Sequence, residues 1–377
     1  MSISPTELRL RGKEAIRQLH TLANYPRLTS LDLSRCEQLS DLSPLADLTQ
    51  LTSLTLSGCP QVNDLSPLAT LPQLTSLTLS DCEQLRDLSP LAGLRQLTIL
   101  RLSAIQASDL SPLAGLSQLT TLHLDSKLTS DFSSLAGLSR LTILHLGCEQ
   151  LRDLSTLASL TQLTSLDLSW CPQVSDLNSL AGLTQLISLS LRGYERMPDL
   201  SPLAGLLQLS SLDLSYCQQM PNLSPLADLP QLTTLNLSSC SEIRDLASLA
   251  SLTRLISLNL GYNPQLSDLS SLADLTRLTT LYLWNCPQLR DLSPLTNLTQ
   301  LSWLRLSDCP QLRDLSPLAN LTRLTMLDLR NCKRISDLTP LTGLIHLNAL
   351  DLRGNRSRIR AGRLRGLDTL PQRGLVW

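Results

Sequence analysis

Aromatic residues and long apolar runs are both scarce in this chain of 377 residues. Aromatic residues make up 3% of the sequence and include a single phenylalanine, so we expect leucine to build the core. No run of about 18 apolar residues occurs, so we expect no helix that crosses a membrane. The formal net charge is -1, so no overall field attracts nucleic acid or an anionic membrane. We therefore expect neither as a partner.

The first residues, MSISPTELRLRGKE, contain no apolar stretch typical of a secretory signal. We therefore expect a cytoplasmic protein.

Signatures of catalysis and cofactor binding are also missing. The glycine-rich phosphate loops, the H-E-x-x-H zinc motif and the G-x-S-x-G nucleophile motif are absent. No C-x-x-C pair supports structural zinc. Among the 4 histidines only His123 and His145 lie near each other, which leaves little for acid–base catalysis. We expect a protein that is not an enzyme and has no cofactor.

The sequence repeats itself every 22 or 23 residues. The segment Leu28–Gln50 reads LTSLDLSRCEQLSDLSPLADLTQ, and Leu51–Gln73 reads LTSLTLSGCPQVNDLSPLATLPQ. Such a period predicts a solenoid, in which stacked units share one continuous core. We predict one elongated monomeric domain with three parts: a degenerate N-terminal capping repeat at 1–27, the repeat array at 28–355, and a C-terminal cap or tail at 356–377.

Each unit combines two local patterns. The words L-T-x-L-x-L alternate apolar and polar residues, which predicts a strand with one buried face. The words D-L-S-P-L-A-x-L place leucines three apart, which predicts a short helical turn. Ser43 is expected to cap this turn, with Pro44 at its first position. Consecutive strands must then be parallel, in one curved sheet.

The pattern L-x-x-L-x-L-x-x-C/N resembles the leucine-rich repeat signature over about residues 5–355. The words D-L-S-P-L-A-x-L-T-x-L are similar to the internalin and phosphatase-regulator subclass. The resemblance implies an α/β fold, namely a right-handed arc with a concave parallel sheet and short helical or 3-10 turns on the convex side. It also implies that the concave sheet binds another protein.

Two polar rows recur within the repeat. Cysteine, or asparagine at 263 and 355, follows the last strand leucine of most units, and we expect these side chains to turn inward and donate to loop carbonyl groups. A disulfide framework is the alternative. Aspartates such as Asp41 recur before the helical turn, where they are expected to cap N–H groups.

The middle residue of each L-x-L word is expected to face solvent on the concave sheet, about 5 Å from its counterparts in neighbouring units. One cluster in this column is His123, His145 and Asp167, with Asp125 on the same face. Two histidines and carboxylates could hold a metal with open positions, whereas the alternative is a solvated, pH-sensitive pair.

A second cluster is aromatic and lies in the C-terminal half. Tyr282 and Trp284 share a strand, Trp303 lies on the next strand, and Arg305 is beside Tyr282. Exposed Trp, Tyr and Arg in one patch are typical anchors of a binding interface. The predicted partner-binding residues are Trp170, Tyr216, Tyr262, Tyr282, Trp284, Trp303 and Arg305.

The stretch from Arg353 onward is rich in arginine and is either a site for an anionic partner or a polar cap over the last repeat. From these features we predict a non-enzymatic scaffold that binds a protein on its concave face. The alternatives are a sensor or regulatory subunit of a signalling NTPase or phosphatase assembly, and a metal site or metalloenzyme at His123 and His145.

Overall fold

The computed structural model describes residues 6–220, 222–355 and 375–376. Contacts within the chain divide it into two compact units, Met1–Leu186 (unit 1) and Ile187–Trp377 (unit 2). The expectation of one uninterrupted domain stays a prediction. The predicted C-terminal cap, with its arginines from Arg356 onward, lies outside the described residues except for 375–376.

Unit 1 contains one α-helix, α1 (Gly12–Leu19), and a series of parallel strands among its described residues. The strands are β1 (Glu7–Arg9), β2 (Ser30–Asp32), β3 (Ser53–Ser57), β4 (Ser76–Ser80), β5 (Ile99–Ser103), β6 (Thr121–Asp125), β7 (Ile143–Gly147) and β8 (Ser165–Asp167). The 3-10 helices are η1 (Leu22–Asn24), η2 (Ser43–Leu45), η3 (Ser66–Thr70), η4 (Ser89–Gly93), η5 (Ser111–Gly115), η6 (Ser133–Gly137), η7 (Ser155–Ser159) and η8 (Asn178–Leu180).

Unit 2 repeats the same alternation of strand and turn. Its strands are β9 (Ser188–Ser190), β10 (Ser211–Asp213), β11 (Thr234–Asn236), β12 (Ser257–Asn259), β13 (Thr280–Tyr282), β14 (Trp303–Arg305), β15 (Met326–Asp328), β16 (Ala349–Asp351) and β17 (Leu375–Val376). Its 3-10 helices are η9 (Ser201–Gly205), η10 (Ser224–Asp228), η11 (Ala247–Ser251), η12 (Ser270–Leu272), η13 (Ser293–Leu295), η14 (Ser316–Leu318) and η15 (Thr339–Leu341).

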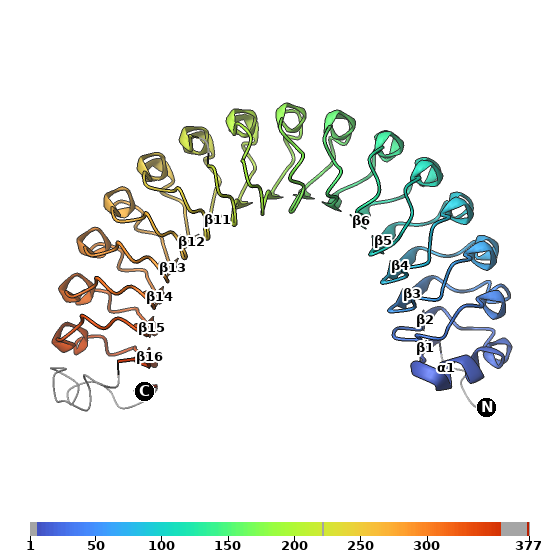
Figure 1. The fold of residues 1–377 in the computed structure, drawn as a ribbon, viewed down its shortest axis with the longest axis horizontal. Coiled ribbons are helices and arrows are strands. Elements are labelled where there is room, and N and C mark those ends of the chain that lie inside the picture. The colour runs from blue at the N-terminus through green and yellow to red at the C-terminus, as the bar shows by residue number, and fades with distance from the viewer. Residues whose placement is uncertain (1–5, 221, 356–374, 377) are drawn as a thin grey trace. The chain divides into compact units, whose positions relative to one another are not determined.

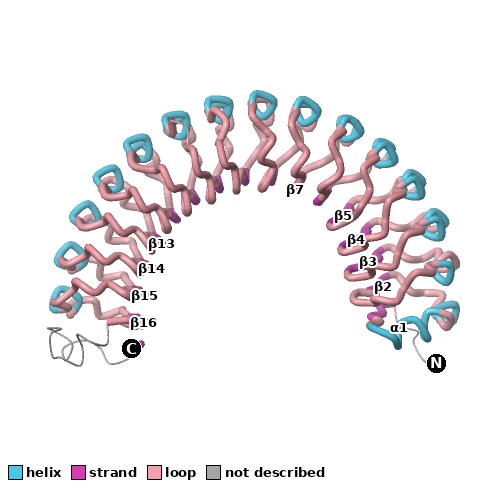
Figure 2. Tube along the Cα trace, viewed as in Figure 1, coloured by secondary structure: helices cyan, strands magenta, loops and turns pink. Residues whose placement is uncertain are grey.

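The strands pair in the register that the repeat predicts. Leu31 of β2 pairs with Leu54 of β3, one 23-residue period later, and Leu122 of β6 pairs with Leu144 of β7 across a 22-residue period. In each unit the strands line the concave side and the 3-10 helices line the convex side (Figures 1 and 2). The predicted fold class is therefore confirmed. Among the described residues, no helix combines the length and apolar character that crossing a bilayer requires.

Leucines from the strands and from the turns meet in a core between these two sides. Leu31, Leu33, Leu45 and their counterparts in later coils are at most a few per cent exposed. A single coil could not bury this face alone, so the stacking of neighbouring coils supplies most of the stability.

The cysteine row is confirmed as a ladder of buried free thiols. Each Sγ atom donates to a leucine carbonyl oxygen of the preceding coil, at 3.0 to 3.6 Å. Asn263 replaces cysteine with a stronger set of bonds: its Nδ2 atom donates to Leu237 O at 2.9 Å and its Oδ1 atom accepts the N–H of Cys240. Tyr194, which the repeat pattern does not predict, fills the same position and is fully buried.

The aspartate row is confirmed as a capping device. In 13 coils a side-chain oxygen of the row accepts a backbone N–H two residues later, at 2.7 to 3.2 Å. The prediction that Ser43 caps the turn is wrong. Ser43 is the first residue of η2 and donates its own N–H to Asp41, and Pro44 stands second. The turn is a short 3-10 helix, so its cap lies earlier than that of an α-helix.

We predict that none of the 10 thiols reacts with Ellman's reagent in the native protein at pH 8 and that all react in guanidinium. Burial excludes the reagent and also raises the pKa of the Cys82 and Cys332 thiols to about 12, so little thiolate is present. Labelling is followed by absorbance. Fast labelling of one or more thiols without unfolding would contradict the buried ladder.

Candidate functional site

The column of concave residues lies in the predicted order within each unit. In unit 1, Arg101, His123, His145 and Asp167 are paired from strand to strand. In unit 2, Asn259, Tyr282, Arg305, Asp328 and Asp351 follow one another in the same way. The concave surface is therefore a continuous row of polar and aromatic side chains within each unit.

Several acidic and amide side chains of this column also accept hydrogen bonds from backbone N–H groups. Asp167 Oδ1 accepts the N–H of Ser169 at 2.9 Å, and Asn259 Oδ1 accepts the N–H of Gly261 at 3.1 Å. Asp328 and Asp351 make the same bond to the residue two positions later. These side chains cap the end of the strand, so an acidic residue in this column is not by itself a binding group.

The histidine cluster of unit 1 is a stacked pair next to a carboxylate. The rings of His123 and His145 stack with their centroids 5.6 Å apart. His145 Nδ1 lies 2.8 Å from Asp167 Oδ2. Asp125 pairs with Gly147 at the end of the same strands. The structure thus brings His123, His145 and Asp167 into one line along the concave face.

The pKa values of the two histidines are shifted in opposite directions. The hydrogen bond to Asp167 raises the pKa of His145 above its ordinary value of 6.5. Burial, followed by the nearby Arg101 and His145, lowers the pKa of His123. Burial would raise the pKa of Asp167, but hydrogen bonds from His145 and Ser169 outweigh it and bring the pKa to about 2. His145 and Asp167 therefore form an ion pair to a higher pH than an ordinary histidine would allow, whereas His123 loses its proton at a lower pH.

Metal binding at this cluster has little geometric support. Among the residues that the structure describes, no group of 3 or more His, Cys, Asp or Glu side chains is arranged to hold a metal ion. His145 presents Nδ1 to Asp167, so one ring nitrogen and one carboxylate are engaged with each other.

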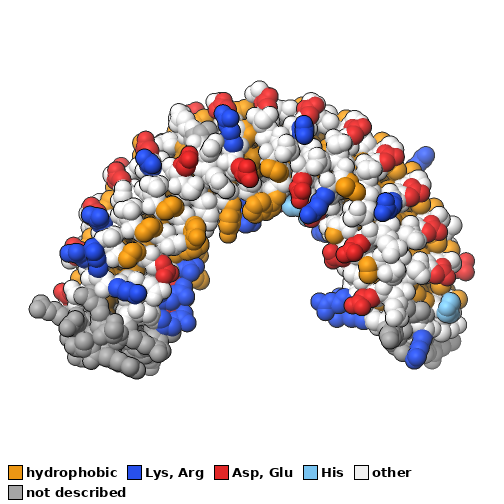
Figure 3. Space-filling view, in the orientation of Figure 1, with side chains coloured by type: hydrophobic (Ala, Val, Ile, Leu, Met, Phe, Trp, Pro, Cys, Tyr) orange, Lys and Arg blue, Asp and Glu red, His pale blue; other side chains and the backbone are white. Residues whose placement is uncertain are grey.

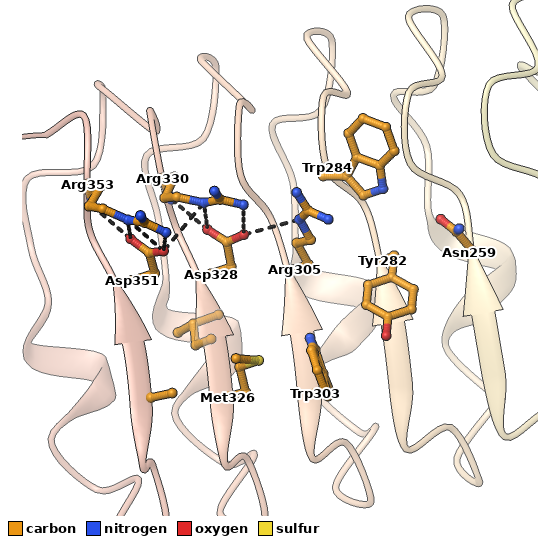
Figure 4. Close-up of a pocket in the computed structure, with 12 residues that line it drawn as sticks. Asn259, Tyr282, Trp284, Trp303, Arg305, Met326, Asp328, Arg330, Asp351 and Arg353 are labelled. Carbon is orange, nitrogen blue, oxygen red and sulfur yellow. Dashed lines mark hydrogen bonds and ion pairs between the residues drawn. The ribbon is translucent and has the colours of Figure 1, made fainter. Parts of the chain in front are cut away.

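A pocket of about 640 Å³ opens on the concave face of unit 2, between β12 and β16. Four predicted partner-binding residues, Tyr282, Trp284, Trp303 and Arg305, line it together. The Tyr282 and Trp303 rings pack edge to face with their centroids 6.1 Å apart (Figure 4). Trp303 is 43% exposed, so this aromatic wall faces solvent without serving the leucine core.

The Trp284 indole packs against Gly261 of the preceding coil. A Cβ atom on Gly261 would lie 2.1 Å from the indole Nε1, so no other residue could occupy position 261 without moving the ring. The Tyr262 ring lies 5.5 Å from the indole on one side, and the Arg305 guanidinium lies 5.1 Å from its centroid on another. Tyr262 does not itself line the pocket, but it packs against Trp284, which is held by three neighbours.

A row of alternating charges closes the pocket on its other side (Figure 4). Arg305 Nε lies 3.1 Å from Asp328 Oδ2, and Arg330 Nη2 lies 2.8 Å from the same carboxylate. Asp351 is bound in turn by Arg330 at 3.5 Å and by Arg353 at 2.6 Å. Figure 3 shows basic side chains gathered on the concave side of unit 2 near β16. From the sequence, Arg305 is predicted as an anchor and Arg353 only as the start of the arginine-rich stretch.

Two arginines of this row occupy the same position in their coils. Arg330 and Arg353 directly follow the last strand leucine, as the predicted anchor Trp284 does, where most coils carry serine. Departures from serine in this column are a signal that the sequence contains. The opposite edge of the pocket, formed by Met326 and Ala349, carries no such signal because these residues are unremarkable in a strand.

The remaining predicted anchors lie apart from the pocket. Tyr216 stacks with Arg192, whose guanidinium is 5.4 Å from its ring, and Trp170 belongs to unit 1. Trp170, Tyr216 and Tyr262 all adopt a left-handed backbone conformation with φ near 61°, directly before the ladder residue. Their partner-binding role stays a prediction.

We predict that His145 titrates above pH 6.5 and His123 below it, as measured by NMR of the imidazole protons. Asp167→Asn should lower the pKa of His145, and the amide keeps the acceptor for Ser169 N–H, as Asn236 does for Ser238. Because the folded pKa of His145 is raised, its stabilising contribution is present below pH 6.5 and is lost as pH rises through the folded value. If both histidines titrated together near 6.5 in the wild-type protein, the assigned ion pair would be wrong.

Comparison with known proteins places the chain in a family. The family described as Leucine Rich repeats (2 copies) matches residues 26–70, 253–297 and 299–343. No curated protein sequence matches the chain. The internalin InlF of Listeria monocytogenes is 33% identical, over 77% of this chain and 84% of that one, with a TM-score of 0.67. The functional domain of InlJ from the same organism, whose structure includes a cysteine ladder, is 26% identical over 82% of this chain and 64% of that one, with a TM-score of 0.60.

A leucine-rich repeat protein of Leptospira interrogans shares the fold at 21% identity, with a TM-score of 0.76 over 98% of this chain and all (100%) of that one. The internalin InlF provides the stronger argument, because its identity and coverage are both high enough to show common descent. The chain is an internalin-like member of the leucine-rich repeat family.

Proposed function

We propose that this protein is a non-enzymatic scaffold that binds a partner protein on the concave sheet of unit 2. The observation that supports this best is the pocket lined by Tyr282, Trp284, Trp303 and Arg305. These residue types dominate the binding energy of protein interfaces when they cluster. The wider family supports a binding role in general, since the leucine-rich repeat fold presents a preformed surface.

The aromatic wall is largely preorganised. Trp284 is fixed between Gly261, Tyr262 and Arg305, and Trp303 is fixed against Tyr282. A partner that docks here has few side chains to immobilise, so little of the interaction energy is lost to conformational entropy. Covering apolar area of this kind contributes roughly 25 cal/mol for each Å² before the entropic cost of association is subtracted.

We predict that Trp284→Ala and Trp303→Ala each weaken partner binding by about 2 kcal/mol or more while the fold is retained. The partner is captured from a lysate with the wild-type protein and identified by mass spectrometry, and its affinity for each variant is then measured by calorimetry. Far-UV circular dichroism checks the fold.

Ile345→Ala is the matched control for these variants. Ile345 is 77% exposed and does not line the pocket, so its loss removes apolar surface without touching the site. Equal affinity of the wild type and both tryptophan variants would place the binding site elsewhere on the protein.

A further inference from the structure

The pocket of unit 2 has two chemically different strips that run across the same three strands. Trp303, Met326 and Ala349 are paired in register and form an apolar strip at the start of β14, β15 and β16. The charged strip consists of Arg305, Asp328 and Asp351, which are paired in the same way, together with Arg330 and Arg353. Residues two apart in a strand point to the same face and are about 7 Å apart, so the two strips lie side by side on the concave surface.

In the charged strip the arginine side chains are more exposed to solvent than the aspartate side chains. The Asp328 and Asp351 side chains are 11% and 19% exposed, whereas those of Arg305, Arg330 and Arg353 are 36%, 30% and 52% exposed. Among the residues that line the pocket, 3 arginines face 2 aspartates, so 3 − 2 leaves one positive charge without an internal counter-ion. A bound group meets guanidinium groups whose orientation is already fixed by the recessed carboxylates.

From these two strips we propose that the partner contributes an extended segment with an apolar side chain and, two residues away, an acidic side chain. This inference rests on the proposed function. In an extended chain, side chains two residues apart also lie about 7 Å apart on one face, which matches the separation of the strips. The apolar side chain lies on Met326 and Ala349 against Trp303. The carboxylate lies on Arg330 and Arg353, whose guanidinium groups fold back over Asp328 and Asp351 and whose planar donors suit it.

The charge balance favours an acidic peptide over a nucleic acid. A nucleic acid binds by neutralising many phosphates, typically 6 to 10 in a protein–DNA contact, and requires as many uncompensated cations. This pocket offers one uncompensated positive charge. A single carboxylate balances it, and a run of phosphates would meet the recessed carboxylates of Asp328 and Asp351.

The test is a selection of random 12-residue peptides displayed on phage against the wild-type protein. Peptides bound in the pocket are defined as those lost with the Trp284→Ala/Trp303→Ala double variant. We expect these to be enriched for Asp or Glu two positions from a large apolar residue. A synthetic peptide of the selected sequence should bind Arg353→Gln at least 10-fold more weakly. The same peptide with its acidic residue replaced by the amide should bind both proteins equally.

Arg101→Gln is the matched control, because Arg101 occupies the concave column of unit 1 and its loss removes the same charge away from the pocket. If the selected peptides are apolar without an acidic residue, the acidic motif is wrong and the proposed function stands. If no peptide depends on Trp284 and Trp303, both proposals fail. Tighter binding of a 12-nucleotide single-stranded DNA than of the selected peptide would also overturn the inference.

Discussion

The burial of leucine between successive coils is the constraint on which the rest of this structure depends. Each coil presents an apolar face that only its neighbours can cover, so the strand leucines, the turn leucines and the ladder position are fixed by packing. The polar rows follow from the same constraint. A buried thiol or amide has to satisfy loop carbonyl groups, and an aspartate has to satisfy a backbone N–H group at the start of most of the 3-10 helices. The positions that packing leaves free to vary on this surface are the concave column and the residue that directly follows the last strand leucine.

Most of the fold could be predicted from the sequence because it is periodic. The pairing of His123 with His145, or of Tyr282 with Arg305, needs only the 22- or 23-residue spacing and the two-residue alternation of a strand. The capping role of Asp41 was predictable for the same reason, since a residue that recurs in nearly every coil serves the framework. Ser43 was assigned wrongly because the sequence pattern does not distinguish a 3-10 helix from the first turn of an α-helix.

The candidate site was predictable only in part. The sequence singled out Tyr282, Trp284, Trp303 and Arg305 because aromatic residues are rare here. The rest of the charged row was missed because its character comes from contacts between side chains of different strands. Nothing in the sequence indicates that Asp328 is covered by two arginines, or that Arg330 bridges two aspartates. Met326 and Ala349 line the pocket only because they lie beside Trp303 on the neighbouring strands.

The glycine beneath Trp284 has a consequence for how such an array can evolve. Coils of this fold look interchangeable, and a gene encoding them can gain, lose or duplicate one without disturbing the core. The indole, however, needs a residue without a side chain at the position 23 residues earlier, and most coils of this chain carry serine there. Copying the coil with Trp284 to another point in the array would therefore keep the scaffold but displace the ring. The scaffold is modular, whereas the recognition surface is inherited in adjoining pairs of coils.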